Sequence, residues 1–115
     1  MSDDCLFCRI ARHELPATIV LEDEHVVAIR DINPQAPTHV LVLPREHIRS
    51  AAELTESHDA LWGHMVRIAQ RIARDEGIDA NGYRLVANVG AHGGQTVDHL
   101  HVHLLGGRQM RWPPG

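Results

Sequence analysis

His99-Leu100-His101-Val102-His103-Leu104-Leu105 alternates histidine with aliphatic residues. Successive side chains of a β-strand point to opposite faces, so this stretch predicts a strand with three imidazoles on one face and an aliphatic stripe on the other. A helix would turn His101 away from the other two histidines and would leave no continuous apolar stripe. We therefore expect a strand over residues 99–105, ended by the glycines at 106 and 107.

Three imidazoles in register on one strand face indicate a reactive site. Histidine changes its charge near neutral pH and serves as a nucleophile, a proton carrier or a metal ligand. The plain alternative is an exposed strand face that happens to be rich in histidine. That alternative suits a single histidine better than a row of three.

Composition narrows the class of protein. The chain of 115 residues is long enough for one hydrophobic core, so we expect a single domain over residues 1–115. The formal charge is −4 and the 11 Lys and Arg residues are scattered, which argues against binding to nucleic acid or to a membrane surface. No apolar run approaches the roughly 20 residues of a membrane span, and the first residues are acidic where a signal peptide is basic. We expect a cytoplasmic protein with a small-molecule partner.

The remaining patterns predict a short helix, a long helix and four further strands. The short helix covers residues 5–12, with Asp3 or Asp4 as its cap, and the long helix begins at Thr55 or Ser57 and stops at Gly77. Strands are expected at 17–21, 25–29, 38–43 and 83–88, with a proline-containing loop at 31–37 and a glycine-rich loop at 89–97. This order predicts an α+β domain whose antiparallel sheet of about five strands is covered on one face.

The long helix carries an apolar stripe that should lie on the sheet. Its members recur at helical spacing and are Leu61, Met65, Ile68, Ala69 and Ile72. His58 and His64 are six positions apart and do not share a helix face, so we interpret both as surface residues.

The sequence resembles the histidine-triad (HIT) proteins, whose signature is His-x-His-x-His followed by aliphatic residues. The resemblance extends from residues 99–105 to residues 31–39, to Asn88, to residues 94–96 and to the ending 106–115, so nearly the whole chain is covered. The ending is similar to that of the nucleotide-binding Hint branch, whose members are homodimeric purine nucleoside phosphoramidases. The resemblance implies a HIT-like fold, with one long helix and a short N-terminal helix.

The resemblance also implies a reaction. It is the hydrolysis of the P–N bond of a purine nucleoside 5'-phosphoramidate, of the adenosine 5'-monophosphoramidate type, through a nucleotidyl-histidine intermediate at His101. His39 and His103 would stabilise the phosphoryl group through hydrogen bonds or partial positive charge, and a backbone carbonyl would hold the second ring nitrogen of His101. Thr96, which stands where a serine is common, would donate the proton to the departing amine. No cofactor is expected for catalysis.

Substrate contacts are implied in the same way. Asp31 would accept hydrogen bonds from the ribose hydroxyls, and the backbone of Gly94, Gln95 and Thr96 would approach the phosphate, although an ordinary glycine hairpin is the plain alternative. Asn88 and Trp112 match positions of the substrate site. The purine of an AMP or GMP type nucleotide would lie between apolar side chains that would equally suit a core: Leu6, Phe7, Ile10, Ile29 and Ile32.

Cys5-x-x-Cys8 resembles zinc-carrying bacterial members, which implies a structural zinc ion bound by Cys5, Cys8, His47 and His99. Residues three apart share a helix face, so both thiolates can reach one ion. A closed site with four protein ligands has no open position for water, so the ion would tie the first helix to the sheet and take no part in P–N cleavage. The alternative is that the two cysteines are small apolar residues or a redox pair.

Other functions stay open at the level of sequence. The chain could be a regulatory module that binds zinc or a nucleotide without turnover, a metal-dependent hydrolase with the triad as ligands, or a dinucleoside polyphosphate hydrolase of the same family. A homodimer is expected, because an exposed sheet edge favours association and the tail 112–114 offers cover for it.

Overall fold

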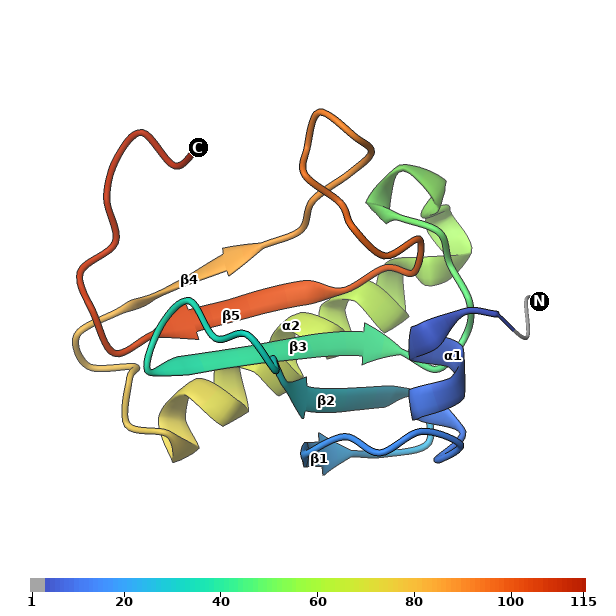
Figure 1. The fold of residues 1–115 in the computed structure, drawn as a ribbon, viewed down its shortest axis with the longest axis horizontal. Helices are drawn as coiled ribbons and strands as arrows, with labels where there is room; N and C mark the ends of the chain where they lie inside the picture. Colours follow the sequence, from blue (N-terminus) through green and yellow to red (C-terminus); the bar gives the residue numbers. More distant parts are fainter. Residues whose placement is uncertain (1–3) are drawn as a thin grey trace.

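The computed structural model describes residues 4–115 and shows an α+β fold, as predicted. One antiparallel sheet has five strands in the order β1-β2-β3-β5-β4 (Figure 1). The elements are α1 Leu6–Ala11, β1 Ile19–Glu22, β2 Val26–Arg30, β3 Thr38–Pro44, the 3-10 turns η1 Ala51–Glu53 and η2 Glu56–His58, α2 Asp59–Asp75, β4 Tyr83–Val86 and β5 Val102–Gly106. Every predicted strand and both predicted helices are present.

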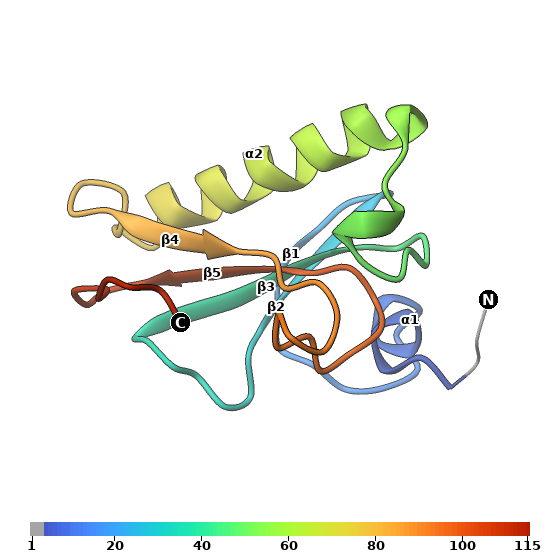
Figure 2. The ribbon, with the colours of Figure 1, turned by 90° about the horizontal axis from the view of Figure 1, so that it is seen from above.

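Helix α2 lies along one face of the sheet (Figure 2). Four of the five predicted stripe residues are buried against it, and Leu61 packs at the margin. The aliphatic residues that alternate with the histidines, Leu100, Val102 and Leu104, belong to the same cluster. Each such side chain contributes about 1.5–3 kcal/mol on burial, so the alternation determines which face of β5 meets α2. None of the helices in residues 4–115 is long and apolar enough to cross a membrane.

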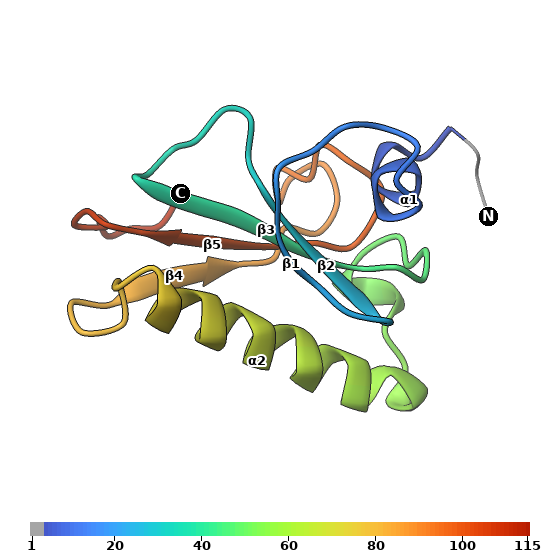
Figure 3. The ribbon, with the colours of Figure 1, turned by 90° about the horizontal axis from the view of Figure 1, so that it is seen from below.

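A second apolar cluster lies on the opposite face of the sheet, so the prediction of a sheet covered on one face is wrong. Helix α1 covers one end of that face, as Figure 3 shows from below. Strand β2 is apolar on both sides: Val26 and Ala28 face α2, while Val27 and Ile29 join the cluster of α1. Two apolar faces in one strand need cover on both sides, and α1 supplies the second cover.

The helix ends differ from the prediction in detail. Cys5 is the N-cap of α1 and its Sγ accepts a hydrogen bond from the Cys8 backbone N–H at 3.3 Å; the Asp3 alternative lies outside the described residues. His58 is a half-buried capping residue whose Nδ1 accepts from the Thr55 N–H at 3.0 Å. His64 is also half-buried, with Nε2 2.5 Å from an Asp23 oxygen. The two histidines are therefore held by partners and are not free surface residues.

Strand β5 begins at Val102, three residues later than the alternation predicts. The Leu100 N–H donates to the Ile48 carbonyl at 2.6 Å, outside the ladder with β3. The last paired residues are Val42 and Val102. Continuing this register would place Leu100 opposite Pro44, which has no N–H to offer, so the ladder cannot continue there. The chain therefore reaches His99 and His101 as an irregular segment that keeps the alternation of side chains.

An ion pair connects the sheet to the end of α2. Arg30 donates to both carboxylate oxygens of Glu76, at 2.6 and 3.0 Å. This hydrogen-bonded guanidinium lowers the pKa of the Glu76 carboxyl. Arg30 is the last residue of β2 and Glu76 directly follows α2, and in Figure 1 these ends of the two elements lie away from α1.

Candidate functional site

His101 is held in one orientation by the backbone. Its Nδ1 lies 2.7 Å from the His99 carbonyl oxygen, and the side chain is buried against the ring of Phe7. A carbonyl oxygen only accepts, so Nδ1 carries the proton and Nε2 keeps its lone pair. The predicted backbone acceptor is therefore confirmed, and the free nitrogen is the one that can attack an electrophile.

His39 and His103 form a second hydrogen-bonded unit. They are diagonal neighbours on β3 and β5, because Leu41 pairs with His103. The Gln35 N–H donates to His39 Nδ1 at 3.0 Å, so His39 Nε2 carries the proton and donates to His103 Nδ1 at 2.9 Å. His103 is then left with Nε2–H as a free donor.

Burial keeps both of these imidazoles neutral. It lowers the pKa of His39, and it lowers the pKa of His103 to about 4, with the neighbouring histidines adding to the effect. Of the two predicted ways to stabilise a phosphoryl group, this favours hydrogen bonding over positive charge. The rings of His101 and His103 are 5.0 Å apart, so the donor lies beside the candidate nucleophile.

Asp31 joins this unit from the loop after β2. Its Oδ2 lies 3.4 Å from His39 Nε2, and its Oδ1 accepts from the Asn33 N–H at 2.8 Å. Asp31, His39 and His103 each offer one possible metal-ligand atom, and these three atoms lie within 4.8 Å of one another, which is close enough for a metal ion. The Gln35 hydrogen bond argues against one, since it leaves a proton on the His39 nitrogen that would have to bind the ion.

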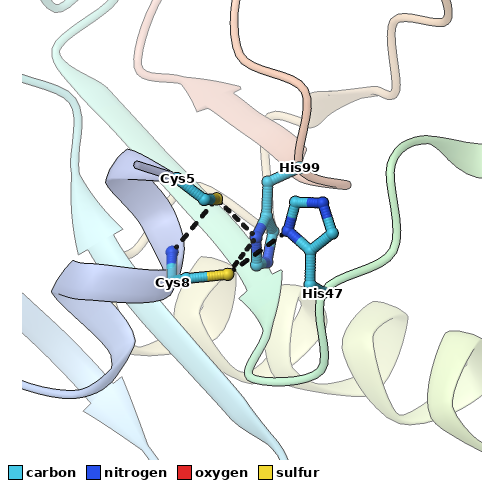
Figure 4. Close-up of side chains that lie close together, drawn as sticks. All are labelled: Cys5, Cys8, His47 and His99. Atoms are coloured by element: carbon cyan, nitrogen blue, oxygen red, sulfur yellow. Dashed lines mark hydrogen bonds between the residues drawn. The ribbon is translucent and has the colours of Figure 1, made fainter. Parts of the chain in front are cut away.

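Cys5, Cys8, His47 and His99 form a separate cluster (Figure 4). The His99 Nδ1 lies 3.3 Å from the Cys5 sulfur and 3.5 Å from the Cys8 sulfur, and the His47 Nδ1 lies 3.2 Å from the Cys8 sulfur. Tetrahedral zinc, with Zn–S near 2.3 Å and Zn–N near 2.0–2.1 Å, separates sulfur and nitrogen ligands by about 3.5 Å. The spacing of the cluster therefore fits such an ion.

The protonation of His99 also suits a metal ligand. Its Nε2 donates to the Pro44 carbonyl at 2.8 Å, which leaves a lone pair on the Nδ1 that faces both sulfurs. Burial lowers the pKa of His99 to about 4 and raises the pKa of the Cys8 thiol to about 11. A divalent cation would displace the thiol proton and compensate the buried thiolate.

The glycine-rich loop is stabilised by its own contacts. The Gln95 amide nitrogen donates to the Arg49 carbonyl at 2.7 Å, and its oxygen accepts from the Gly90 N–H at 2.9 Å. A Cβ on Gly93 would collide with the backbone of Val89, and Gly94 has φ +82°. The glycines are therefore required by the loop itself, whether or not the loop meets a phosphate.

The remaining predicted substrate residues are distributed over different environments. Phe7, Ile10 and Ile29 are enclosed in the α1 cluster, whereas Leu6 is 45% and Ile32 99% exposed. The five apolar side chains therefore differ widely in exposure. The structure brings Leu6 and Thr96 together in a hollow of about 540 Å³, while Asn88 is half-buried and Trp112 lies on the surface.

Sequence reasoning missed the backbone groups of this region. The Gln35 N–H and the Pro44 carbonyl decide the protonation of His39 and His99, and no side-chain pattern marks them. The sequence predicts Phe7 as a purine contact, and its ring also lies edge-on to the His99 and His101 rings, with centroids 5.9 and 5.0 Å away.

Comparison with known proteins places these features in a family. A family model described as the HIT domain matches residues 12–110. Purine nucleoside phosphoramidase of Escherichia coli is 46% identical over 110 residues, 96% of this chain and 92% of the relative. The 14 kDa zinc-binding protein of Zea mays is 49% identical over 112 residues, 96% of this chain and 87% of the relative.

A solved structure is similar to this chain in both fold and sequence. The crystal structure of a HIT family hydrolase from Legionella pneumophila superposes with a TM-score of 0.96 at 51% identity. The similarity covers 97% of this chain and 100% of that chain.

Proposed function

The chain belongs to the HIT domain family, and from that membership we propose that it is a hydrolase of purine nucleoside 5'-phosphoramidates. The observation that carries the proposal is the His101 tautomer, with Nδ1–H on the His99 carbonyl and Nε2 free. The relative from Escherichia coli, named purine nucleoside phosphoramidase, supports the substrate class.

The proposed reaction has two displacements at phosphorus. In the first, His101 Nε2 attacks, a P–N bond to the ring forms, and the P–N bond to the amine breaks as the Thr96 hydroxyl supplies a proton. In the second, water attacks the nucleotidyl-histidine, the bond to Nε2 breaks, and the proton of the water returns to the Thr96 oxygen. The His103 Nε2–H donates to a phosphoryl oxygen in both steps, and His39 keeps that proton in place through His103 Nδ1.

In this proposal different residues bind the ribose, the purine and the phosphate of the substrate. Asp31 accepts from the ribose hydroxyls, since its Oδ2 has only the long contact to His39. The purine lies against the apolar side chains Leu6, Phe7, Ile10, Ile29 and Ile32, of which Leu6 and Ile32 are the exposed members. The assigned contacts of the phosphate and leaving group are Asn88, Gly94, Gln95, Thr96 and Trp112.

Stereochemistry at phosphorus tests this function. The protein as purified is given an adenosine 5'-phosphoramidate that is chiral at phosphorus through isotopic or sulfur substitution, and the product AMP analogue is analysed. Two inverting displacements predict net retention of configuration. Inversion would indicate direct attack by water, as expected of a metal-dependent hydrolase. Binding of AMP without turnover would indicate a regulatory module, and faster cleavage of a dinucleoside polyphosphate would indicate that class of hydrolase.

The proposal includes a structural zinc ion at Cys5, Cys8, His47 and His99. It is supported by the ligand spacing, by the neutral His99 and by the name of the maize relative. When bound, the ion would supply a cross-link between α1 and the segments that carry the two histidines. A reducing compartment keeps both thiols available, so cytoplasmic placement is part of the proposal.

We further propose that two copies of the chain associate as a homodimer. Strand β4 lies at an edge of the sheet, Leu85 on it is 38% exposed, and Trp112 of the tail is 82% exposed. An open edge beside exposed apolar groups favours pairing with a second copy. Light scattering at micromolar concentration should give twice the mass of the chain, and a fully active monomer would contradict the proposal.

A further inference from the structure

His99 contacts both the metal-ligand cluster and the candidate nucleophile. Its ring Nδ1 faces the Cys5 and Cys8 sulfurs, and its ring Nε2 donates to the Pro44 carbonyl. Its own backbone carbonyl accepts the hydrogen bond from His101 Nδ1. The residue is fully buried, at 0% exposure, so its ring has little room to turn independently of its backbone. Any displacement of the ring therefore moves the acceptor that orients His101.

Phe7 makes a second connection between the metal-ligand cluster and His101. It lies on α1 between the two cysteines, and its ring is edge-on to His101 at 5.0 Å and 84°. Helix α1 has only six residues, too few to be stable without tertiary contacts. The position of α1 therefore depends on its apolar contacts with the sheet and on the bonds between Cys5 or Cys8 and the two histidines His47 and His99.

We propose that the Cys5–Cys8–His47–His99 cluster positions His101, so that metal occupancy of the cluster sets the tautomer and orientation of the nucleophile. This inference rests on the proposed function and deepens it. His99 is a positioning residue, and the cluster takes no part in bond making or breaking. Thiol hydrogen bonds are weak, so a cluster joined only by S–H contacts would hold the His99 carbonyl loosely.

The expected consequence is a loss of reaction rate without a loss of substrate binding. Neutral imidazole has two tautomers, and only the one with Nδ1–H on the His99 carbonyl presents Nε2 as the attacking atom. A misplacement of about 1 Å in a reacting group can lower a rate by about a hundredfold. Asp31, which binds the ribose in the proposal, belongs to the other histidine unit and has no contact with the cluster among those described.

The test compares metal-loaded and metal-depleted full-length protein, with Cys8→Ser and His47→Gln as variants. His47→Gln is included because it leaves both cysteines of α1 and its N-cap in place. ¹⁵N chemical shifts of the His101 ring report the tautomer at one fixed pH. Loaded protein should show Nδ1–H alone. Depleted protein and both variants should show exchange between tautomers, with kcat for adenosine 5'-phosphoramidate lowered about tenfold or more and KM changed less than about twofold. Added zinc should restore the depleted wild-type protein and not Cys8→Ser.

Glu76→Gln is the matched control. It removes the ion pair with Arg30, at the other end of β2 from the cluster, and should lower the unfolding midpoint without changing the His101 tautomer or kcat. The inference is overturned if folded, metal-depleted protein keeps a single His101 tautomer and an unchanged kcat. Failure of the proposed function looks different: loaded protein would not turn over the phosphoramidate, while the ¹⁵N shifts would still report the coupling.

Discussion

Replacement of His101 by alanine is expected to lower kcat for adenosine 5'-phosphoramidate by at least about a thousandfold. The variant loses the Nε2 atom that forms the covalent intermediate. No other triad nitrogen can replace it: the His99 Nδ1 faces the cysteines, and the His103 Nε2 carries a proton. Steady-state kinetics with ammonia or AMP detection measures the effect.

Two comparisons make the His101 result interpretable. His25→Ala removes a histidine that is 67% exposed at its side chain and should keep full activity. Circular dichroism of His101→Ala should show a folded protein, because the aliphatic residues on either side of His101 still pack under α2. A folded His101→Ala protein with less than a tenfold loss would mean that His101 is not the nucleophile.

The double replacement Cys5→Ser with Cys8→Ser is expected to release about one zinc ion per chain and to lower the free energy of unfolding by at least about 3 kcal/mol. Zinc binding contributes roughly 10–16 kcal/mol in small zinc domains, and here the two apolar clusters retain part of the stability. The measurements are elemental analysis of protein purified under reducing, chelator-free conditions and calorimetric unfolding. The lost stability should come mainly from the contacts between α1 and the sheet, because the cluster joins these two parts.

A chelator provides the control for this second result. It should lower the unfolding midpoint of the wild-type protein toward that of the double variant, and it should leave the double variant unchanged. Wild-type protein that carries no metal and does not respond to the chelator would remove the zinc assignment. The two cysteines would then be a capping residue and a buried apolar residue of α1.

Much of the fold follows from local patterns that the sequence displays directly. The alternation at 99–105 determined that Leu100, Val102 and Leu104 pack under α2, and the helical stripe from Leu61 to Ile72 determined which side of α2 meets them. The alternation predicted which face of the sheet each side chain of residues 99–105 takes, because side-chain direction depends on local backbone angles. It did not predict where the hydrogen-bonded pairing with β3 begins, because pairing depends on the neighbouring strand. Pro44, on that neighbour, stopped the ladder before His101.

Tertiary structure alone decided the chemical state of the histidines. The residue pattern predicted His39, His99, His101 and His103 as site residues, but it does not indicate which nitrogen of each ring carries the proton. That assignment is made by the Pro44 carbonyl, the Gln35 N–H and the His99 carbonyl. Every residue has such backbone groups, so no sequence marks them. Only the packing of β3, the loop 31–37 and the segment before β5 brings them within hydrogen-bonding distance of the rings, and this separates a metal ligand at His99 from a free nucleophile at His101.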